Sequence, residues 1–255
     1  MSRSTHYYVR KSHRFLGLLL GIQFLLWTAG GLYFSWSNMQ EIRGDVNRKQ
    51  PSWLSPDISV VSPSVVLQSL KKRRKVDSVL SVRLLDVLGK PTWQIRTGIY
   101  QEHLNGTRKL YQYAHLADAE TGELRGPLTR EEAIVLATQQ FSPTAKVKNV
   151  QYFTTVPTDH EYRENTLPAY AIELDHPSRT RVYIAAEMGE VTKFRNDKWR
   201  VFDFLWMLHT MDYQGRDHIG NLLLRIFSIF GMITIFSGFL LFYYSNRSRN
   251  KRRYR

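Results

Sequence analysis

FLGLLLGIQFLLWTAGGLYF, residues 15–34, is a run of 20 residues without a charged side chain. A helix rises about 1.5 Å per residue, so this run can cross a hydrocarbon core of about 30 Å. A second apolar stretch covers residues 222–244 and carries one charge, Arg225, near its start. A long side chain there can reach the membrane interface. The pattern predicts transmembrane helices at 15–34 and 221–244.

A cleaved signal peptide is the alternative reading of the first run. Signal sequences have shorter apolar regions, about 7–15 residues, and end in a cleavage site of the Ala-x-Ala type. Thr28-Ala29-Gly30 is a poor match to that site. We therefore expect residues 15–34 to stay in the protein as an uncleaved anchor.

The charges are divided unevenly along the chain. All 22 Asp and Glu lie between residues 35 and 220, whereas the two ends carry only Lys and Arg. Cytoplasmic flanks of membrane spans collect Lys and Arg. We therefore expect a multi-pass membrane protein with both termini cytoplasmic and the central domain on the outer side.

The formal net charge of +14 does not indicate nucleic-acid binding. Residues 1–34 and 221–255 hold 11 of the 36 Lys and Arg and no acid, so the central segment is nearly neutral. The basic ends are expected to contact anionic membrane lipid. The chain has no cysteine, which excludes disulfides, thiolate metal sites and cysteine nucleophiles.

Local signals place two helices in the central segment. Ser62-Pro63 supplies an N-cap followed by proline at the first helical position, and Thr129 with Glu132 forms a capping box. Three strands are predicted after each helix, at residues 79–87, 93–97 and 110–117 in one set and 147–153, 167–174 and 181–191 in the other.

The two sets are a repeat. Residues 113–124 align with residues 182–191 through an Ala-Glu-x-Gly-Glu core, which is residues 119–123 in one copy and 186–190 in the other. The predicted class is α+β, two transmembrane helices flanking two units of helix plus antiparallel sheet. The predicted boundaries are a basic N-terminus 1–14, a span 15–34, a linker 35–61, repeats 62–127 and 128–200, an interfacial amphipathic segment 201–220, a span 221–244 and a basic tail 245–255.

Several motifs resemble the PepSY domain and the membrane proteins associated with it. The Asp-Ala-x-Thr-Gly-Glu-Leu hairpin at residues 118–124 is similar to that domain. His-Arg-x-Leu-Gly at 13–17 and Leu-His-x-Met-Asp at 208–212 look like the helical segments of its membrane relatives. The resemblance covers residues 10–245 and implies a tandem PepSY-like domain between two spans. It also implies a protein of the bacterial inner (cytoplasmic) membrane, with this domain in the periplasm. Many relatives have four or more spans, so this chain is a candidate half of a larger assembly.

Two histidines are candidate haem ligands. Some larger relatives are haem-containing reductases of ferric siderophores with histidine ligands on membrane helices, so the resemblance implies that His13 and His209 could bind haem b. On a helix, Asp212 would share a face with His209 and could orient its imidazole as an outer-shell partner. The alternatives are an interfacial His13 facing headgroups and a structural His209–Asp212 cap. His218 is a weaker candidate.

One haem cannot join His13 to His209 within a single chain, because a hydrocarbon core of about 30 Å separates the two expected positions. A bis-histidine site would need a homo-oligomer or a membrane redox partner. Gly17-x-x-x-Gly21 permits close helix approach of that kind, although chance, or packing on the chain's own second span, explains it as well.

No catalytic or metal-binding motif, phosphate loop or dinucleotide fingerprint is present, so the sequence leaves enzymatic activity undecided. The first functional hypothesis is an accessory or haem-linked electron-transfer component of iron acquisition or redox metabolism. The second is a membrane-tethered scaffold that binds proteins or regulates a peptidase. A structural subunit of a membrane complex is the third.

Overall fold

The computed structural model describes residues 3–50, 52–103 and 106–253. Small parts of the predicted basic N-terminus, linker, first repeat and basic tail (residues 1–2, 51, 104–105 and 254–255) lie outside the described residues. The chain divides into two compact units, one formed by residues 1–38 with 201–255 and the other by residues 39–200. The protein is mixed α+β, with two antiparallel sheets between apolar helices.

Two long helices dominate the first unit: α1, Arg3–Trp36, and α6, Leu222–Arg253. Arg10–Trp36 and Leu222–Ser245 are long and apolar enough to cross a membrane, by length and composition. Many of their large side chains are open to the surroundings, such as Leu18 at 75% and Phe239 at 68% exposure. That pattern suits helices that face lipid rather than a protein core.

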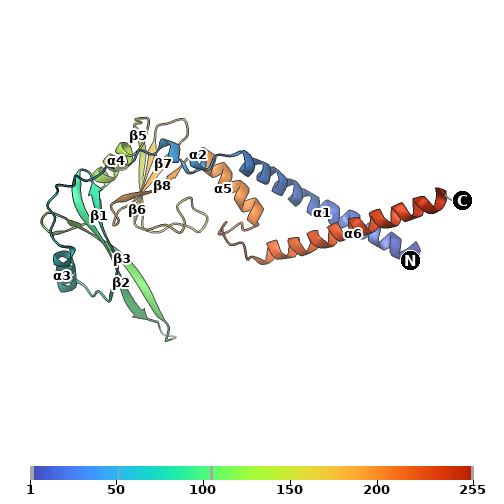
Figure 1. Ribbon diagram of the computed structural model, residues 1–255, viewed down its shortest axis with the longest axis horizontal. Helices are drawn as coiled ribbons and strands as arrows, with labels where there is room; N and C mark the ends of the chain where they lie inside the picture. Colours follow the sequence, from blue (N-terminus) through green and yellow to red (C-terminus); the bar gives the residue numbers. More distant parts are fainter. Residues whose placement is uncertain (1–2, 51, 104–105, 254–255) are drawn as a thin grey trace. The chain divides into compact units, whose positions relative to one another are not determined.

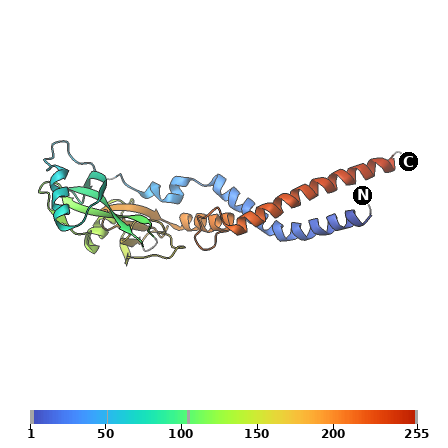
Figure 2. The ribbon, with the colours of Figure 1, turned by 90° about the horizontal axis from the view of Figure 1, so that it is seen from below.

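Helices α1 and α6 contact each other where their ribbons cross (Figure 1). At this contact, glycines of α6 meet larger side chains of α1. A Cβ at Gly231 would lie 3.1 Å from the Phe24 ring, and one at Gly238 would lie 3.4 Å from the imidazole of His13. Figure 2 shows the two helices diverging toward their free ends. Gly17 and Gly21 have open space at their Cβ positions, so packing of this motif on the chain's own second span is not the explanation.

The predicted interfacial segment, residues 201–220, is helical only in its first half. Helix α5 runs Asp197–Thr210, and the following residue, Met211, has a positive φ of 53°. The carbonyl of Leu208 accepts a hydrogen bond from Gln23 of α1 at 2.8 Å. Asp203, 3% exposed, pairs with Arg216 beyond the helix end. These bonds hold the end of α5 against α1.

The second unit contains two four-stranded antiparallel sheets, each in sequential order. The first sheet follows helix α3, and its strands are β1 to β4; the second follows helix α4, and its strands are β5 to β8. Two short helices, α2 and η1, precede them. The bounds are α2 Met39–Arg43, η1 Asp45–Asn47, α3 Pro63–Arg73, β1 Ser78–Val87, β2 Lys90–Glu102, β3 Arg108–Asp118, β4 Leu124–Arg125, α4 Arg130–Gln139, β5 Val147–Phe153, β6 Ala169–Leu174, β7 Arg181–Ala185 and β8 Glu190–Arg195.

Both predicted helix starts are confirmed. The Ser62 hydroxyl accepts the N–H of Ser64 at the start of α3. At α4, Thr129 and Glu132 form both bonds of the capping box. Each cap satisfies backbone donors that the first turn of a helix leaves without intrahelical partners.

The two predicted repeats have matching backbone bonds. Val61, just before α3, donates its N–H to Ala119 at 2.8 Å, and Leu128, just before α4, donates to Ala186 at 2.9 Å. Ala119 and Ala186 in turn donate to Pro91 and Pro168, both at 3.0 Å. Gly122 and Gly189 hold φ angles of 79° and 69° in the corresponding turns.

The predicted strand count of three per repeat is wrong, because each sheet has four strands. The predicted strand 181–191 is two strands, β7 and β8, with a turn at residues 186–189. In the first repeat, the short strand β4 corresponds to β8. The chain reverses direction at Gly189, which has a positive φ. Glycine adopts this conformation readily because it has no Cβ to clash with the backbone.

One hydrophobic cluster joins the two repeats, and the first repeat has a further cluster of its own around Val66, Leu70 and Ile95. Val87, at the end of β1, is 1% exposed and packs with Leu136 of α4 and with Ile172 and Ile184 of the second sheet. The buried side chain of Gln94 on β2 donates to the carbonyl of Met188 in the β7–β8 turn. Burial of this apolar surface joins the repeats into one unit.

Candidate functional site

A cleft of about 700 Å³ lies between the two repeats. We call it the inter-repeat cleft. The segment after η1 forms one wall, and the ends of β1 and β8 form the other. Its lining residues are Arg48, Ser52, Trp53, Leu54, Arg83, Leu84, Leu85, Asp86, Gln140, Gly189, Glu190 and Val191. Its volume is within the range of about 300–1,000 Å³ typical of ligand sites.

The wall of the cleft formed by β1 is an open sheet edge. β1 pairs with β2 on one side, and no other strand within the described residues pairs with it. Val79, Leu80 and Val82 along this strand are 43%, 39% and 37% exposed. Open edges offer unpaired N–H and C=O groups to an incoming strand, and natural proteins usually protect them with charges or covering segments.

Paired charges sit at the mouth of the cleft. The guanidinium of Arg83 lies 3.3 Å from the Glu190 carboxylate and 3.4 Å from the Gln94 side-chain oxygen. Arg48 donates to the carbonyl of Val191 at 3.3 Å and lies over the ring of Phe194. These contacts connect β1 to β8, and the residue that follows η1 to β8.

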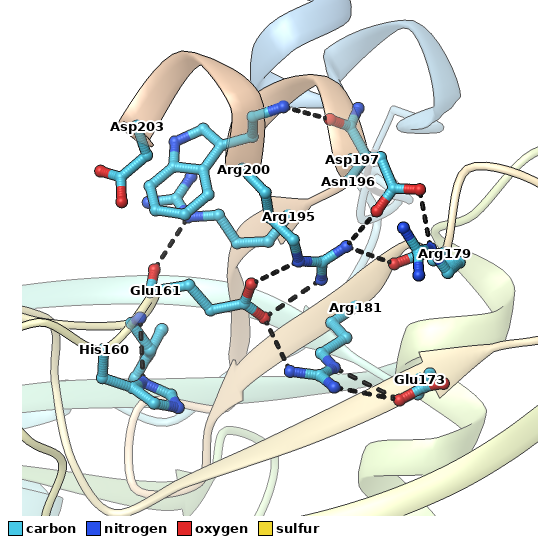
Figure 3. A network of polar contacts seen from close by, with 12 residues as sticks. His160, Glu161, Glu173, Arg179, Arg181, Arg195, Asn196, Asp197, Arg200 and Asp203 are labelled. Atoms are coloured by element: carbon cyan, nitrogen blue, oxygen red, sulfur yellow. Dashed lines mark hydrogen bonds and ion pairs between the residues drawn. The ribbon is translucent and has the colours of Figure 1, made fainter. Parts of the chain in front are cut away.

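A second polar feature, the Glu161 network, is shown in Figure 3. The carboxylate of Glu161 lies between two guanidiniums, accepting from Arg200 at 2.8 Å and from Arg181 at 3.2 Å. It also accepts the hydroxyl hydrogen of Tyr183 at 2.7 Å. Its carbonyl accepts from Arg195 at 2.9 Å. The four contacts tie the β5–β6 loop to β7, β8 and the first turn of α5.

The electrostatics of this network favour a charged Glu161 and a neutral Tyr183. Burial on its own raises the pKa of Glu161, but hydrogen bonds from Arg200 and Tyr183 and the two arginine charges lower it more, so the pKa lies below its ordinary value. Burial, and then the Glu161 charge, raise the pKa of Tyr183. The carboxylate is saturated with donors, so this network is suited to holding the loop rather than to proton transfer.

The network continues to the start of α5. Arg200 also contacts Asp197 at 3.0 Å, and Asp197 contacts Arg179 at 2.8 Å. Asn196 accepts the N–H of Trp199 and donates to the carbonyl of Glu41, both at 2.8 Å. Asn196 therefore acts as an N-cap that also fixes α2 beside the helix.

Of the predicted haem ligands, His13 lies at the α1–α6 contact. Its Nδ1 is 2.7 Å from the Ser237 hydroxyl. Its Cε1 approaches Gly238. His13 therefore faces the second apolar helix, and a hydrogen bond at Nδ1 fixes the orientation of its ring.

His209 lies among aromatic rings near the opposite end of the α1 span. Its ring centroid is 5.9 Å from that of Trp27, and 6.1 Å from those of Phe34 and Trp206. His13 and Trp27 are 14 positions apart on α1, about 21 Å along the helix axis. The structure does not bring His13 and His209 together within one chain.

The predicted pairing of Asp212 with His209 assumed that one helix carries both residues, and this assumption is wrong. The helix ends at Thr210, so Asp212 is not on the helical face of His209. Its carboxylate instead accepts the backbone N–H groups of Gly215 at 3.0 Å and His218 at 2.9 Å. These bonds lower its pKa, although burial acts in the opposite direction and is the largest single influence. Asp212 organises the turn between α5 and α6.

The remaining histidines are dispersed. His218 contributes its backbone to the Asp212 turn, and His115 bonds the Thr97 hydroxyl at 3.0 Å. Within the described residues no group of three or more His, Cys, Asp and Glu side chains could hold a metal ion. Haem ligation by His13 or His209 stays a prediction.

Sequence reasoning missed Glu161, Arg181 and Arg200, because they are far apart in the chain and belong to a loop, a strand and a helix. It also missed the cleft, since an open sheet edge follows from strand order rather than from any motif. The alternation of residues 79–87 does signal a strand, but not which edge stays free.

Comparisons with protein-family models, curated proteins and solved structures find no match for this chain.

Proposed function

We propose that this chain is a membrane-anchored, non-catalytic protein-binding module. Two apolar helices hold it in the bacterial inner membrane, and its tandem PepSY-like domain on the periplasmic side binds an extended peptide segment of a partner protein. The observation that carries the proposal is the open edge of β1, which runs directly into the inter-repeat cleft.

The edge and the cleft together define the kind of ligand. A peptide added beside β1 would make main-chain hydrogen bonds along the strand, and alternate side chains would reach pockets beside it. Val79 and Val82 on the edge and the Trp53 side chain, 85% exposed at the cleft wall, supply apolar contact. Arg83 and Asp86 supply both signs of charge, so the cleft suits a segment of mixed, mainly apolar composition.

The two apolar helices would hold the domain at the membrane, which suits a protein-binding function better than a freely diffusing domain does. The resemblance to PepSY domains, which elsewhere resemble protease propeptides, makes a peptidase a reasonable partner. The Glu161 network holds the β5–β6 loop and the start of α5, which gives the binding unit a rigid frame. Rigid frames reduce the entropy cost of binding.

The test uses the full chain in lipid nanodiscs and an array of synthetic extended peptides as the probe. Val82→Lys places a charge on the open edge, which blocks strand addition. We expect bound peptides to lose about tenfold or more in affinity, equivalent to about 1.4 kcal/mol. Val135→Lys is the matched control, because Val135 is 43% exposed like Val82 at 37%, but it lies on helix α4 and not on the open edge of β1.

Two results would contradict the proposal. In one, no peptide on the array is retained by the unaltered chain. In the other, Val82→Lys and Val135→Lys bind the peptides equally well, which would place binding away from β1.

A haem-linked electron-transfer role is the second candidate. The observation in its favour is the hydrogen bond between His13 Nδ1 and Ser237, because metal-bound histidines use their second nitrogen in this way. Haem at this position would produce a Soret band in the purified protein.

A further inference from the structure

A smaller hollow of about 210 Å³ lies where α3 ends beside β3 and β4. Three arginines from two elements line it, so we call it the arginine pocket. Arg73 and Arg74 come from the end of α3, and Arg125 comes from β4. The other lining residues are Leu70, His115, Leu124 and Gly126.

The charges of the arginine pocket are not balanced. Arg125 is bound to Glu132, with contacts of 2.7 and 2.6 Å to the two carboxylate oxygens. Arg73 and Arg74 form no ion pair with any described residue. Glu187 is near enough to Arg74 for that charge to lower its pKa slightly, but burial raises the pKa more, which weakens Glu187 as a counter-ion. Two guanidinium charges therefore remain available to a ligand.

His115 adds a polar, uncharged group to the wall. Its Nε2 lies 3.0 Å from the Thr97 hydroxyl. Burial, and then the nearby Arg74 charge, lower its pKa below the ordinary value of 6.5, so it is neutral at pH 7. The positive potential of the pocket therefore comes from the arginines.

Arginine and lysine side chains at the C-terminal end of a helix ordinarily interact with the carbonyl groups there. That role applies equally to Lys71 and Lys72 on the same last turn, which do not line the pocket. It does not account for Arg125, which reaches the same hollow from a different element. Three guanidiniums line this one concavity and only Arg125 has a carboxylate partner, and this surplus of positive charge is the feature that points to an anion.

We propose that the arginine pocket binds a phosphate group, either as inorganic phosphate or as the phosphate of a lipid headgroup. Guanidinium forks match the oxygens of phosphate and donate paired hydrogen bonds to them. The pocket is smaller than the usual range for organic ligands and several times the volume of one water, about 30 Å³. One phosphate group fits this size, and the site is independent of peptide binding at the inter-repeat cleft.

The test measures thermal stability of the full chain in an uncharged detergent at constant ionic strength. Inorganic phosphate replaces chloride in one series, and glycerol 3-phosphate, a headgroup mimic, replaces it in the other. A ligand that binds the folded state alone raises the melting temperature as its concentration rises. We expect this rise, and we expect the double variant R73Q/R74Q to weaken binding at least tenfold, because each lost charge-assisted bond contributes about tenfold.

Lys72→Gln is the matched control, since it removes one positive charge from the same helix end outside the pocket. It should change phosphate affinity less than about twofold. The proposal fails if neither phosphate compound stabilises the chain, or if Lys72→Gln weakens binding as much as Arg74→Gln does. Tighter binding of glycerol 3-phosphate identifies the headgroup as the source, whereas equal or tighter binding of inorganic phosphate identifies the free anion.

A second readout locates the bound anion. A phosphate beside His115 offsets the Arg74 charge, so the imidazole signal of His115 in NMR should titrate at a higher pH when phosphate is present. An unchanged titration would place the anion elsewhere and overturn the assignment.

Discussion

At the scale of single residues, Glu161 is the centre of a polar network in the unit formed by residues 39–200. Its side chain is 11% exposed and contacts Arg181, Arg200 and the Tyr183 hydroxyl. If the buried Glu161 carboxylate lost one of these partners, the folded state would lose stability, because a buried charge has given up its hydration and needs its partners to compensate. The network therefore stabilises the folded loop only while every partner is present.

Glu161→Gln keeps the shape of the side chain and removes its charge. We expect the free energy of unfolding to fall by about 2 kcal/mol, the usual size of a lost hydrogen bond to a charged group. Thermal or denaturant unfolding of the full chain in detergent measures it. Glu120→Gln, on an exposed turn, is the control and should change stability by less than about 0.5 kcal/mol.

The stability of Glu161→Gln should also depend on pH differently from that of the unaltered chain. The folded-state pKa of Glu161 lies below its ordinary value of 4.5, so its stabilisation is complete above that pH and is lost as the pH falls through the folded-state pKa. Glu173 and Asp197, with lowered pKa values, act in the same direction. The unaltered chain should therefore lose more stability below pH 4.5 than Glu161→Gln does. Parallel pH curves for the two proteins would refute this role for Glu161.

At the scale of elements, the repeated turn at Gly122 and Gly189 fixes how each helix meets its sheet. Both glycines have positive φ angles, and a Cβ at Gly189 would lie 3.1 Å from Leu116. A Cβ at Gly122 would lie 3.2 Å from Val61. Backbone conformation and close packing together require glycine at these two positions.

Gly189→Ala should destabilise the chain more than Gly89→Ala. Both positions have positive φ, so each alanine is strained by about 1–2 kcal/mol, but a Cβ at Gly89 meets nothing within 4 Å. The added contact with Leu116 should raise the cost at Gly189 by roughly 1 kcal/mol or more, the usual cost of overpacking. Unfolding measurements compare the two variants, and equal losses would show that Leu116 moves aside freely.

Prediction from sequence succeeded where the signals are local. Ser62-Pro63 and the Thr129–Glu132 pair identify helix starts because a cap involves residues only a few positions apart. It failed at residues 181–191, where no proline or asparagine marks the turn, and at Asp212, where the helix ends sooner than the pattern suggests. The cleft and the Glu161 network depend on strand order and on residues about 20 and 39 positions apart, so no local pattern reveals them.

At the scale of the whole molecule, the distribution of charge is matched by the division into units. The apolar helices belong to one unit, together with the acid-free ends of the chain, and the nearly neutral repeats form the other. Positively charged flanks favour the cytoplasmic side of a membrane. This distribution fits the proposed topology, in which both chain ends are cytoplasmic and the repeats are on the other side of the membrane.

The most direct test of the account is the membrane topology of the chain. The chain has no cysteine, so Thr144→Cys in the second repeat and Ser248→Cys in the basic tail each create a single reporter thiol. A membrane-impermeant maleimide is applied to bacterial spheroplasts that express either variant. We predict that the cysteine at position 144 is labelled on intact spheroplasts and the one at 248 only after lysis. Labelling of position 248 but not 144 on intact spheroplasts, or release of the protein from membranes by alkaline carbonate, would contradict a membrane-anchored module that faces the periplasm.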